Sequence, residues 1–382
     1  MPESWEWQKL GDIGTWQSGA TPSRLNKEYY GGNIPWLKTG DLDDGYVYEI
    51  PETITQKALE ETSVKLNPAG SVLIAMYGAT IGKVGILTFP ATTNQACCAC
   101  VDYHGIEQMF LFYFLLSHKE EFIMLGGGGA QPNISREKIV DTFIPIPPLL
   151  EQNRIVNAIE QWFYLIDTLE TAKEDLKTSI EHAKSKILDL AIHGKLVPQD
   201  SNDEPAIELL KRINPKCTPC DNAHYENLPK GWTVCALEEI IDYEQPQAYI
   251  VQSTDYKAQY EIPVLTAGKS FIIGYTNESE GIFTDLPVII FDDFTTDSKF
   301  VDFPFKVKSS AMKILHVKEE VNIQYVCWFM SITRLIGDTH KRYWISEYSK
   351  LHIPIPPRNE QDRIINKVNE LFQILDNISA EL

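Results

Sequence analysis

The chain of 382 residues has little positive charge, no long apolar run and no evident cysteine pairs. It carries 34 lysines and arginines against 53 aspartates and glutamates, and the net charge of −19 argues against a protein that binds nucleic acid by bulk electrostatic attraction. The longest apolar run, MFLFYFLL at 109–116, is too short to cross a bilayer. Residues 1–10, MPESWEWQKL, lack the basic and apolar regions of a signal peptide, so none is expected.

The seven cysteines favour a reducing environment. Their number is odd, and three of them crowd into ACCAC at 96–100, where adjacency works against disulfides. A cytoplasmic location is therefore expected. The CTPC motif at 217–220 lies close to His224, but it offers three nearby ligands where a structural zinc site needs four, so a loop with free thiols is expected instead.

Motifs for nucleotide or metal chemistry are also lacking. GATIGKVG at 78–85 has three residues between Gly78 and Gly82 instead of four, and Val84 stands where a phosphate loop needs Ser or Thr. The Asn-Pro-Pro-aromatic motif of amino-methyl transfer is missing. Asp297 and Lys299 form a faint nuclease-like Asp-x-Lys, a motif too common to carry an activity alone. We therefore expect neither catalysis nor a bound cofactor or metal in this chain, with a metal-dependent nuclease as the enzymatic alternative.

The chain repeats one plan twice. IPIPPLLEQNRI at 144–155 and IPIPPRNEQDRI at 353–364 are identical at nine of twelve positions. The starts of the halves also match, with PESWEWQKLGDI at 2–13 resembling PKGWTVCALEEI at 229–240. The sequence between these ends differs, so each half is predicted to be a variable domain followed by a shared helix.

Both predicted helices carry a coiled-coil seam. Apolar residues recur at alternating spacings of four and three from residue 155 to 190 and again from 364 to 382. A straight helix over 155–190 would be about 54 Å long, whereas the second helix ends with the chain after roughly six turns. Each seam needs a partner, and we predict that the two copies pack antiparallel. The predicted interface consists of Ile155, Ile159, Trp162, Ile166, Leu169, Leu176, Ile180 and Ile187, and of Ile364, Val368, Leu371, Leu375 and Ile378.

Two other arrangements stay open: two separate amphipathic helices, each on its own domain, or a coiled-coil scaffold that bridges proteins without binding DNA. The variable blocks are predicted to be mainly β, because β-branched and aromatic runs are broken by Gly, Pro and Asp. Helices are predicted at 105–124, 205–213 and 321–336. The expected fold class is α+β, with two mainly β domains separated by a long antiparallel two-helix coiled coil and related by a pseudo-two-fold repeat.

Glycine-rich loops with polar and aromatic residues remain as candidates for binding. Asn and Gln side chains match adenine, Lys and Arg match guanine, and Asp accepts from cytosine. The same residues also form ordinary turns. The loops are PWLKTGDL (35–42), MYGAT (76–80), TTNQACC (92–98), GGGGAQPNIS (126–135), LTAGKSF (265–271), FDDFTTDSKF (291–300) and HKRYWIS (340–346).

Several of these segments together resemble the specificity subunits of type I restriction-modification systems. They are SGATPSR (18–24), GSVLIAMYGATIGKVGI (70–86), ATTNQACCA (91–99), the first IPIPPLLEQNRI and AIHGKLVPQD (191–200). In that family, two target recognition domains each read one half of a bipartite DNA site, and a coiled coil spaces the half-sites and docks the methyltransferase subunits.

The resemblance implies recognition domains over 1–150 and 228–357, coiled-coil helices over 151–193 and 358–382, and a connector over 194–227. It implies double-stranded DNA, two modification subunits and the restriction (motor-nuclease) subunits as partners. S-adenosylmethionine, ATP and Mg would belong to those partners and not to this chain.

The loops would face DNA, and the resemblance transfers DNA contacts to two groups of residues. In the first half these are Lys38, Thr39, Tyr77, Lys83, Asn94, Gln95, Gln131 and Asn133; in the second half they are Thr266, Lys269, Asp293, Thr295, Lys299, Lys341 and Arg342.

Overall fold

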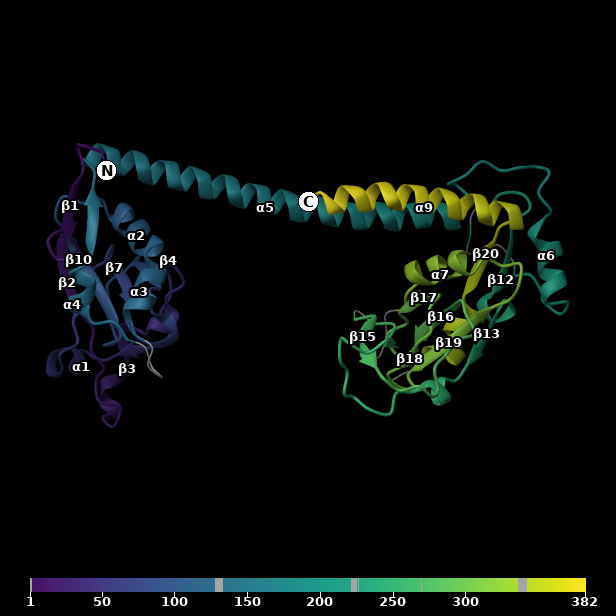
Figure 1. The fold of residues 1–382 in the computed structure, drawn as a ribbon, viewed down its shortest axis with the longest axis horizontal. Coiled ribbons are helices and arrows are strands. Elements are labelled where there is room, and N and C mark those ends of the chain that lie inside the picture. The colour runs from purple at the N-terminus through teal and green to yellow at the C-terminus, as the bar shows by residue number, and fades with distance from the viewer. Residues whose placement is uncertain (1, 128–132, 221–224, 226, 269, 336–341) are drawn as a thin grey trace. The chain divides into compact units, whose positions relative to one another are not determined.

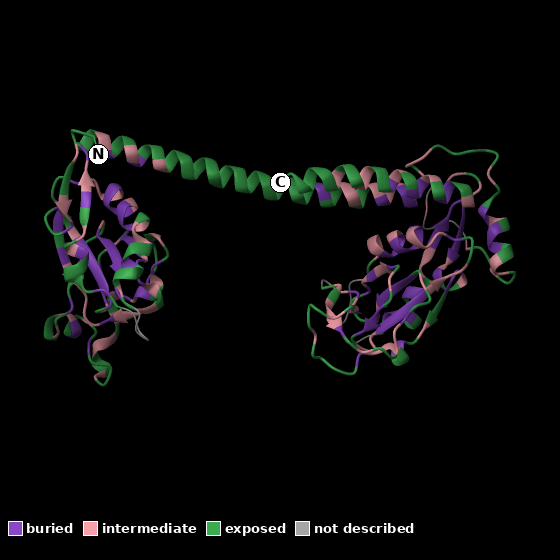
Figure 2. Cartoon of the chain, viewed as in Figure 1, coloured by how far each residue is buried: buried purple, intermediate pink, exposed green. Residues whose placement is uncertain are grey.

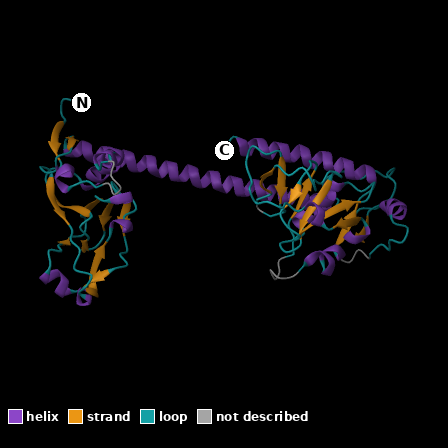
Figure 3. Cartoon of the chain, turned by 60° about the horizontal axis from the view of Figure 1, so that its bottom comes forward, coloured by secondary structure: helices purple, strands orange, loops and turns teal. Residues whose placement is uncertain are grey.

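The computed structural model describes residues 2–127, 133–220, 225, 227–268, 270–335 and 342–382 (Figure 1). The chain divides into two compact units, Met1–Glu170 and Thr171–Leu382. Each unit is β-rich and holds its own buried core, which agrees with the predicted α+β class (Figure 3). No helix among the described residues is both long enough and apolar enough to span a membrane.

The first unit contains a five-stranded sheet of order β2-β10-β7-β8-β4 and a four-stranded sheet of order β5-β3-β9-β6. The strands of the first sheet are β2 (Gly14–Ser18), β10 (Cys97–Tyr103), β7 (Val72–Ala75), β8 (Val84–Leu87) and β4 (Gly45–Val47). Those of the second are β5 (Thr53–Ile54), β3 (Tyr30–Leu37), β9 (Ala91–Thr93) and β6 (Leu66–Asn67). The helices are α1 (Gln56–Glu61), α2 (Gln108–Ser117), α3 (Lys119–Leu125) and α4 (Arg136–Val140).

The second unit is built on sheets of order β13-β19-β16-β17 and β15-β14-β18. The strands of the larger sheet are β13 (Ile241–Glu244), β19 (Met312–Val317), β16 (Val288–Asp292) and β17 (Ser298–Val301). Those of the smaller are β15 (Ile272–Thr276), β14 (Ile262–Leu265) and β18 (Lys306–Val307). The helices besides the long ones are α6 (Ala206–Ile213), α7 (Ile323–Ile332) and α8 (Tyr343–Ser346).

The predicted helix boundaries need correction in two places. The helix predicted over 105–124 is two helices, α2 and α3, because His118 leaves the helical path between them. The helix predicted over 321–336 ends earlier, at Ile332, where Thr333 caps it.

The repeated sequence ends pair with each other in both units. Strand β1 (Glu6–Lys9) runs antiparallel to β11 (Phe143–Ile146), and β12 (Thr233–Ala236) runs antiparallel to β20 (His352–Ile355). The backbone N–H of Leu10 donates to the Thr142 carbonyl, and the N–H of Leu237 donates to the Leu351 carbonyl at the equivalent place. The start and end of each half therefore repeat together because they form one closing strand pair.

A buried glutamine joins each long helix to its unit in the same way. Gln152 and Gln361 are both 0% exposed. Gln152 accepts from the N–H of Glu107, the N-cap of α2, at 2.7 Å, and Gln361 accepts from the N–H of Asn322, the N-cap of α7, also at 2.7 Å. Each side-chain amide also donates to a proline carbonyl five residues earlier in the chain. The repeated EQ pair thus serves as a polar joint between the helix and its domain.

Helix α5 (Leu149–Ile192) has 44 residues and α9 (Arg358–Ala380) has 23. Within the second unit the two lie side by side, as Figures 1 and 3 both show. Lys184 of α5 forms an ion pair with Asp376, and Gln199, just beyond α5, donates to Glu360 near the start of α9. The later residue, Gln199, therefore contacts the start of α9 and the earlier residue, Lys184, contacts a position near its end, so the two helices are antiparallel, as predicted.

The helices pair over only part of the predicted seam. Of the predicted residues, Ile180, Ile364 and Val368 are buried at 6% exposure or less. Ile187, Leu371 and Leu375 are half-buried, and Ile378 is exposed.

Residues 160–179 of α5 are all exposed (Figure 2). Four predicted seam residues lie in this stretch and are 40–69% exposed: Trp162, Ile166, Leu169 and Leu176. The physical reason is that α9 ends at Ala380, opposite about residue 180 of α5. Ile155 and half-buried Ile159 lie near the start of α5, and Ile155 packs against the core of the first unit instead of α9.

Candidate nucleic-acid interface

In the first unit, the candidate loops meet at one end of the sheets. Strands β2, β7 and β3 finish there, and β10 and β8 begin there, because β10 is antiparallel to both β2 and β7 and β7 is antiparallel to β8. The N–H of Met76 donates to the Ala96 carbonyl, and the N–H of Asn94 donates to the Leu37 carbonyl. Tyr77 forms a β-bridge with Asn133. Four loops that are distant in sequence therefore form one continuous surface.

The predicted contact residues differ in how accessible they are. Gln95 and Asn133 are exposed, Tyr77 is 41% exposed, and Asn94 is half-buried. Thr39, by contrast, is only 9% exposed, since it lies in a 3₁₀ turn behind Lys38.

The cationic side chains of this surface are held by carboxylates. Lys38 lies 2.9 Å from Glu52, which also accepts a hydrogen bond from Arg24. The hydrogen bond from Arg24, reinforced by Lys38, holds the pKa of Glu52 below its ordinary value of 4.5. The Arg24 guanidinium also stacks over the Tyr30 ring, 4.4 Å from its centroid. Glu52 therefore orients both Arg24 and Lys38 through one carboxylate.

Lys83 lies directly before β8, and a 3₁₀ turn at Gly78–Thr80 lies between it and Tyr77. Its ammonium group donates to the Leu42 carbonyl at 3.0 Å and lies 3.6 Å from Asp43. These contacts orient it toward the turn at 42–44, and they leave it 31% exposed.

In the second unit, the loop between β16 and β17, residues 293–297, forms the centre of the candidate surface. Phe294 and Thr295 at its tip are exposed. Arg342 is also exposed, and the residues that follow it, Tyr343 and Trp344, hydrogen-bond to Asp293 through their backbone N–H groups. Thr295 and Arg342 are thus brought to the same loop cluster.

Three other predicted residues lie differently. Asp293 is 2% exposed, and its carboxylate pairs with buried Lys313 at 3.2 Å, so a base edge cannot reach it directly. Lys299 is half-buried at the second position of the edge strand β17, separated from the end of the loop by one residue. Thr266 is half-buried in a turn where its hydroxyl donates to the Ser270 carbonyl.

Three further predicted contacts, Gln131, Lys269 and Lys341, lie outside the described residues. So does His224 of the considered zinc motif. Among the residues that the structure describes, no group of three His, Cys, Asp or Glu side chains is placed to hold a metal ion. Cys217 instead hydrogen-bonds to buried Cys235, which lowers the pKa of the Cys217 thiol.

Sequence reasoning missed Arg24, Glu52, Phe294 and Lys313. Arg24 ends the SGATPSR segment, whose sequence does not indicate the carboxylate that Arg24 contacts. Lys313 interrupts the apolar run MKIL at 312–315, and this lysine among apolar residues was the signal in the sequence. A buried lysine requires a buried acid, which the structure shows to be Asp293.

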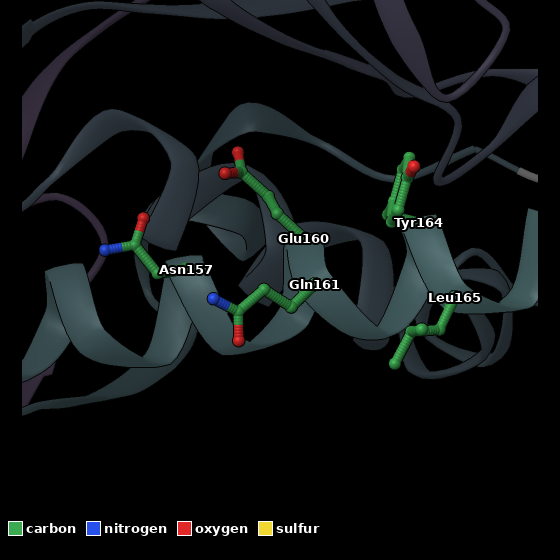
Figure 4. Close-up of a pocket in the computed structure, with 5 residues that line it drawn as sticks. All are labelled: Asn157, Glu160, Gln161, Tyr164 and Leu165. Carbon is green, nitrogen blue, oxygen red and sulfur yellow. The ribbon is translucent and has the colours of Figure 1, made fainter.

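The exposed stretch of α5 contains a hollow of about 560 Å³. It is lined by Asn157, Glu160, Gln161, Tyr164 and Leu165, which all project from this single helix (Figure 4). The side chains do not form a nucleophile and base pair, so the hollow has the character of a protein surface and not of an active site.

Comparisons with known proteins give a consistent result. Residues 2–178 match the family model of the type I restriction modification DNA specificity domain. The EcoR124I/EcoR124II specificity subunit of Escherichia coli is 45% identical over 166 residues, covering 42% of this chain and 39% of that protein. The MjaIX specificity subunit of Methanocaldococcus jannaschii is 29% identical over 256 residues, covering 64% and 53%. The chain thus spans about half or less of the length of these relatives.

Two solved structures share the fold over the whole chain. The HsdS subunit from Thermoanaerobacter tengcongensis aligns with a TM-score of 0.57 at 16% identity, covering 100% of this chain and 92% of that one. A chain from a structural study of complex assembly in the type I R-M system aligns with a TM-score of 0.67 at 15% identity, covering 100% and 93%.

Two β-rich units, each closed by a repeated strand pair and followed by a helix, define the fold class of type I specificity subunits. The match to the specificity-domain model adds the sequence relationship. The chain is therefore similar to type I restriction-modification specificity subunits, and residues 2–178 carry the match to their DNA specificity domain.

Proposed function

We propose that this chain is the DNA sequence-specificity subunit of a type I restriction-modification complex. Each unit would read one half of a bipartite double-stranded target through its loop cluster. The observation that carries the proposal is the repeated joint: the closing strand pair and buried glutamine are the same in both units, whereas the exposed loops differ. Such a design presents two unlike reading surfaces on equivalent supports.

The proposed recognition domains cover residues 1–150 and 228–357, with coiled-coil segments at 151–193 and 358–382 and a connector at 194–227. The coiled coil would set the spacing between half-sites and dock two modification subunits, which would bind S-adenosylmethionine. Restriction subunits would supply ATP- and Mg-dependent activity. We propose that this chain binds none of these cofactors and works in the cytoplasm.

The proposed contacts to DNA are the exposed and half-exposed residues of the two loop clusters. In the first unit these are Lys38, Tyr77, Asn94, Gln95 and Asn133, with Lys83 at the margin. In the second unit they are Phe294, Thr295 and Arg342, with Thr266 at the margin. Their polar and aromatic chemistry suits base edges and sugar-phosphate contacts.

The test is methylation mapping of host DNA with and without this gene. A gene-dependent motif of two defined half-sites separated by a fixed unspecified spacer is the expected result. No gene-dependent motif would contradict the proposal and favour the scaffold alternative. Magnesium-dependent cleavage by the chain alone, lost in Asp297→Ala, would instead support the nuclease alternative; Asp297 is ion-paired with Arg334 at 2.8 Å.

A further inference from the structure

The loop at 293–297 is tied to the sheet beneath it by a buried charge pair. The N–H of Asp293 donates to the Ala311 carbonyl at 3.0 Å, and its carboxylate lies 3.2 Å from the ammonium group of Lys313 in β19. Lys313 donates in addition to Gln245, just beyond β13. Both charged side chains are at most 2% exposed. Buried ions persist only when well paired, so this loop has one strongly preferred position on the sheet.

The same loop holds the chain on both sides of residues 336–341. On the N-terminal side, the Thr296 hydroxyl donates to the Leu335 carbonyl at 3.3 Å and accepts from the Leu335 N–H at 3.2 Å. On the C-terminal side, the Asp293 carbonyl accepts from the Tyr343 N–H at 2.9 Å, and the Asp293 carboxylate accepts from the Trp344 N–H at 2.8 Å. Two residues of this loop, Asp293 and Thr296, thus anchor two separate points of the chain.

The anchoring groups are buried, and the groups beside them are exposed. Tyr343 and Trp344 are 4% and 2% exposed, and Thr296 is fully buried. Thr295 and Arg342, each directly next to an anchor, are exposed. The anchors therefore fix the backbone next to two exposed side chains, and the Thr295 hydroxyl accepts in addition from the Asp297 N–H at 3.4 Å.

We propose that Asp293 is a positioning residue for the second half-site: with Lys313 behind it and Thr296 beside it, it holds Thr295 and Arg342 as one reading surface. It does not itself contact bases, which revises its assignment from the sequence. The inference rests on the proposed function. Directional hydrogen bonds, and not charge alone, do the positioning, because the carboxylate both pairs with Lys313 and accepts from Trp344.

The test compares two double variants in the complete complex in host cells. Asp293→Asn with Lys313→Met removes both charges but keeps an oxygen that can accept from the Trp344 N–H. Asp293→Leu with Lys313→Met removes the charges and the acceptor. A control is Glu278→Gln, which removes the negative charge beside buried Lys306; the two charged groups lie 2.9 Å apart, and their side chains are 20% and 3% exposed.

Methylation mapping is the readout. We expect the asparagine variant and the control to keep the complete motif. We expect the leucine variant to keep the first half-site and the spacer but to relax the second half-site, with roughly tenfold or greater loss of discrimination there, as for losing one good base contact. A merely structural role would lower methylation at all sites without changing the motif, and that result would overturn the inference.

If the melting curve shows that the leucine variant does not fold, the Thr296→Val variant tests the inference in its place. It removes only the hydroxyl bonded to Leu335, and it should also relax the second half-site alone. An unchanged motif in Thr296→Val would then overturn the inference. Failure of the proposed function is distinguishable, because the unsubstituted chain would then give no bipartite motif at all.

Discussion

The two halves of helix α5 have the same heptad pattern and opposite environments. Between residues 180 and 192, the seam residue Ile180 is 6% exposed, and Ile187 packs against the core of the second unit. Between 160 and 179, seam residues such as Ile166 and Leu169 are exposed. An a/d repeat therefore predicts that a helix has a face suited to a partner, while the length of the partner decides where that face is covered.

Placing a charge on the covered seam, at Val368 of α9, and on the exposed seam, at Ile166 of α5, should give the largest contrast. Val368→Glu puts a carboxylate into a site that is 0% exposed, and we expect it to destabilise the second unit by more than about 4 kcal/mol. Ile166→Glu, at a site 45% exposed, should change stability by less than about 0.5 kcal/mol. Urea unfolding of both variants is the measurement. Equal destabilisation would show that the exposed half of α5 is covered in solution.

The same Ile166→Glu variant tests the proposed ruler. We expect it to weaken assembly with modification subunits while leaving both units folded, because the change lies on the uncovered seam. Co-purification measures this, and normal assembly would contradict the role proposed for the coiled coil.

The repeated joint gives the next contrast. Gln361→Leu leaves the Asn322 N–H without its acceptor, and Gln152→Leu does the same to the Glu107 N–H. Each should cost about 1–3 kcal/mol, the penalty for an unsatisfied buried donor. Thermal melts should show similar losses in the two variants. A loss in only one would mean that the two joints are not energetically equivalent.

A smaller effect is expected at Glu360, which is 1% exposed in α9. Burial raises its pKa above the ordinary value of 4.5. Its contribution to stability is thus fully present below pH 4.5 and is lost as the pH rises through the raised pKa. Glu360→Gln should flatten this dependence and raise the melting temperature at pH 7 by less than about 4 °C. Glu151→Gln, at the equivalent half-buried position, is the matched control, and equal changes in both would contradict the explanation.

The smallest effect is expected for the ion pair between Lys184 and Asp376. Its side chains are 30% and 62% exposed, so solvent screens the charges. Lys184→Ala should cost no more than about 1 kcal/mol, part of it from the lost contact with the Phe372 ring. A loss above 2 kcal/mol in calorimetry would show that polar contacts and not the apolar layer hold the helices together.

The internal sequence repeat predicted the main features of the fold. Matching the two halves predicted the domain plan and the antiparallel helices, and the pairing of β1 with β11 follows from ends that repeat together. The individual contacts were less predictable. Asp293 and Thr295 are polar residues two positions apart in the same loop, yet Asp293 is buried against Lys313 and Thr295 is exposed. The difference arises from how the loop packs on the sheet, which the loop sequence alone does not predict.

The most direct test of the central claim is to alter one reading surface at a time and map methylation. Gln95→Ala with Asn133→Ala changes the first unit, and Thr295→Ala with Arg342→Ala changes the second. We predict that each double variant relaxes a different half-site and leaves the other half and the spacer intact. If either variant altered both half-sites, or if both altered the same one, the claim that each unit reads its own half of the target would be contradicted.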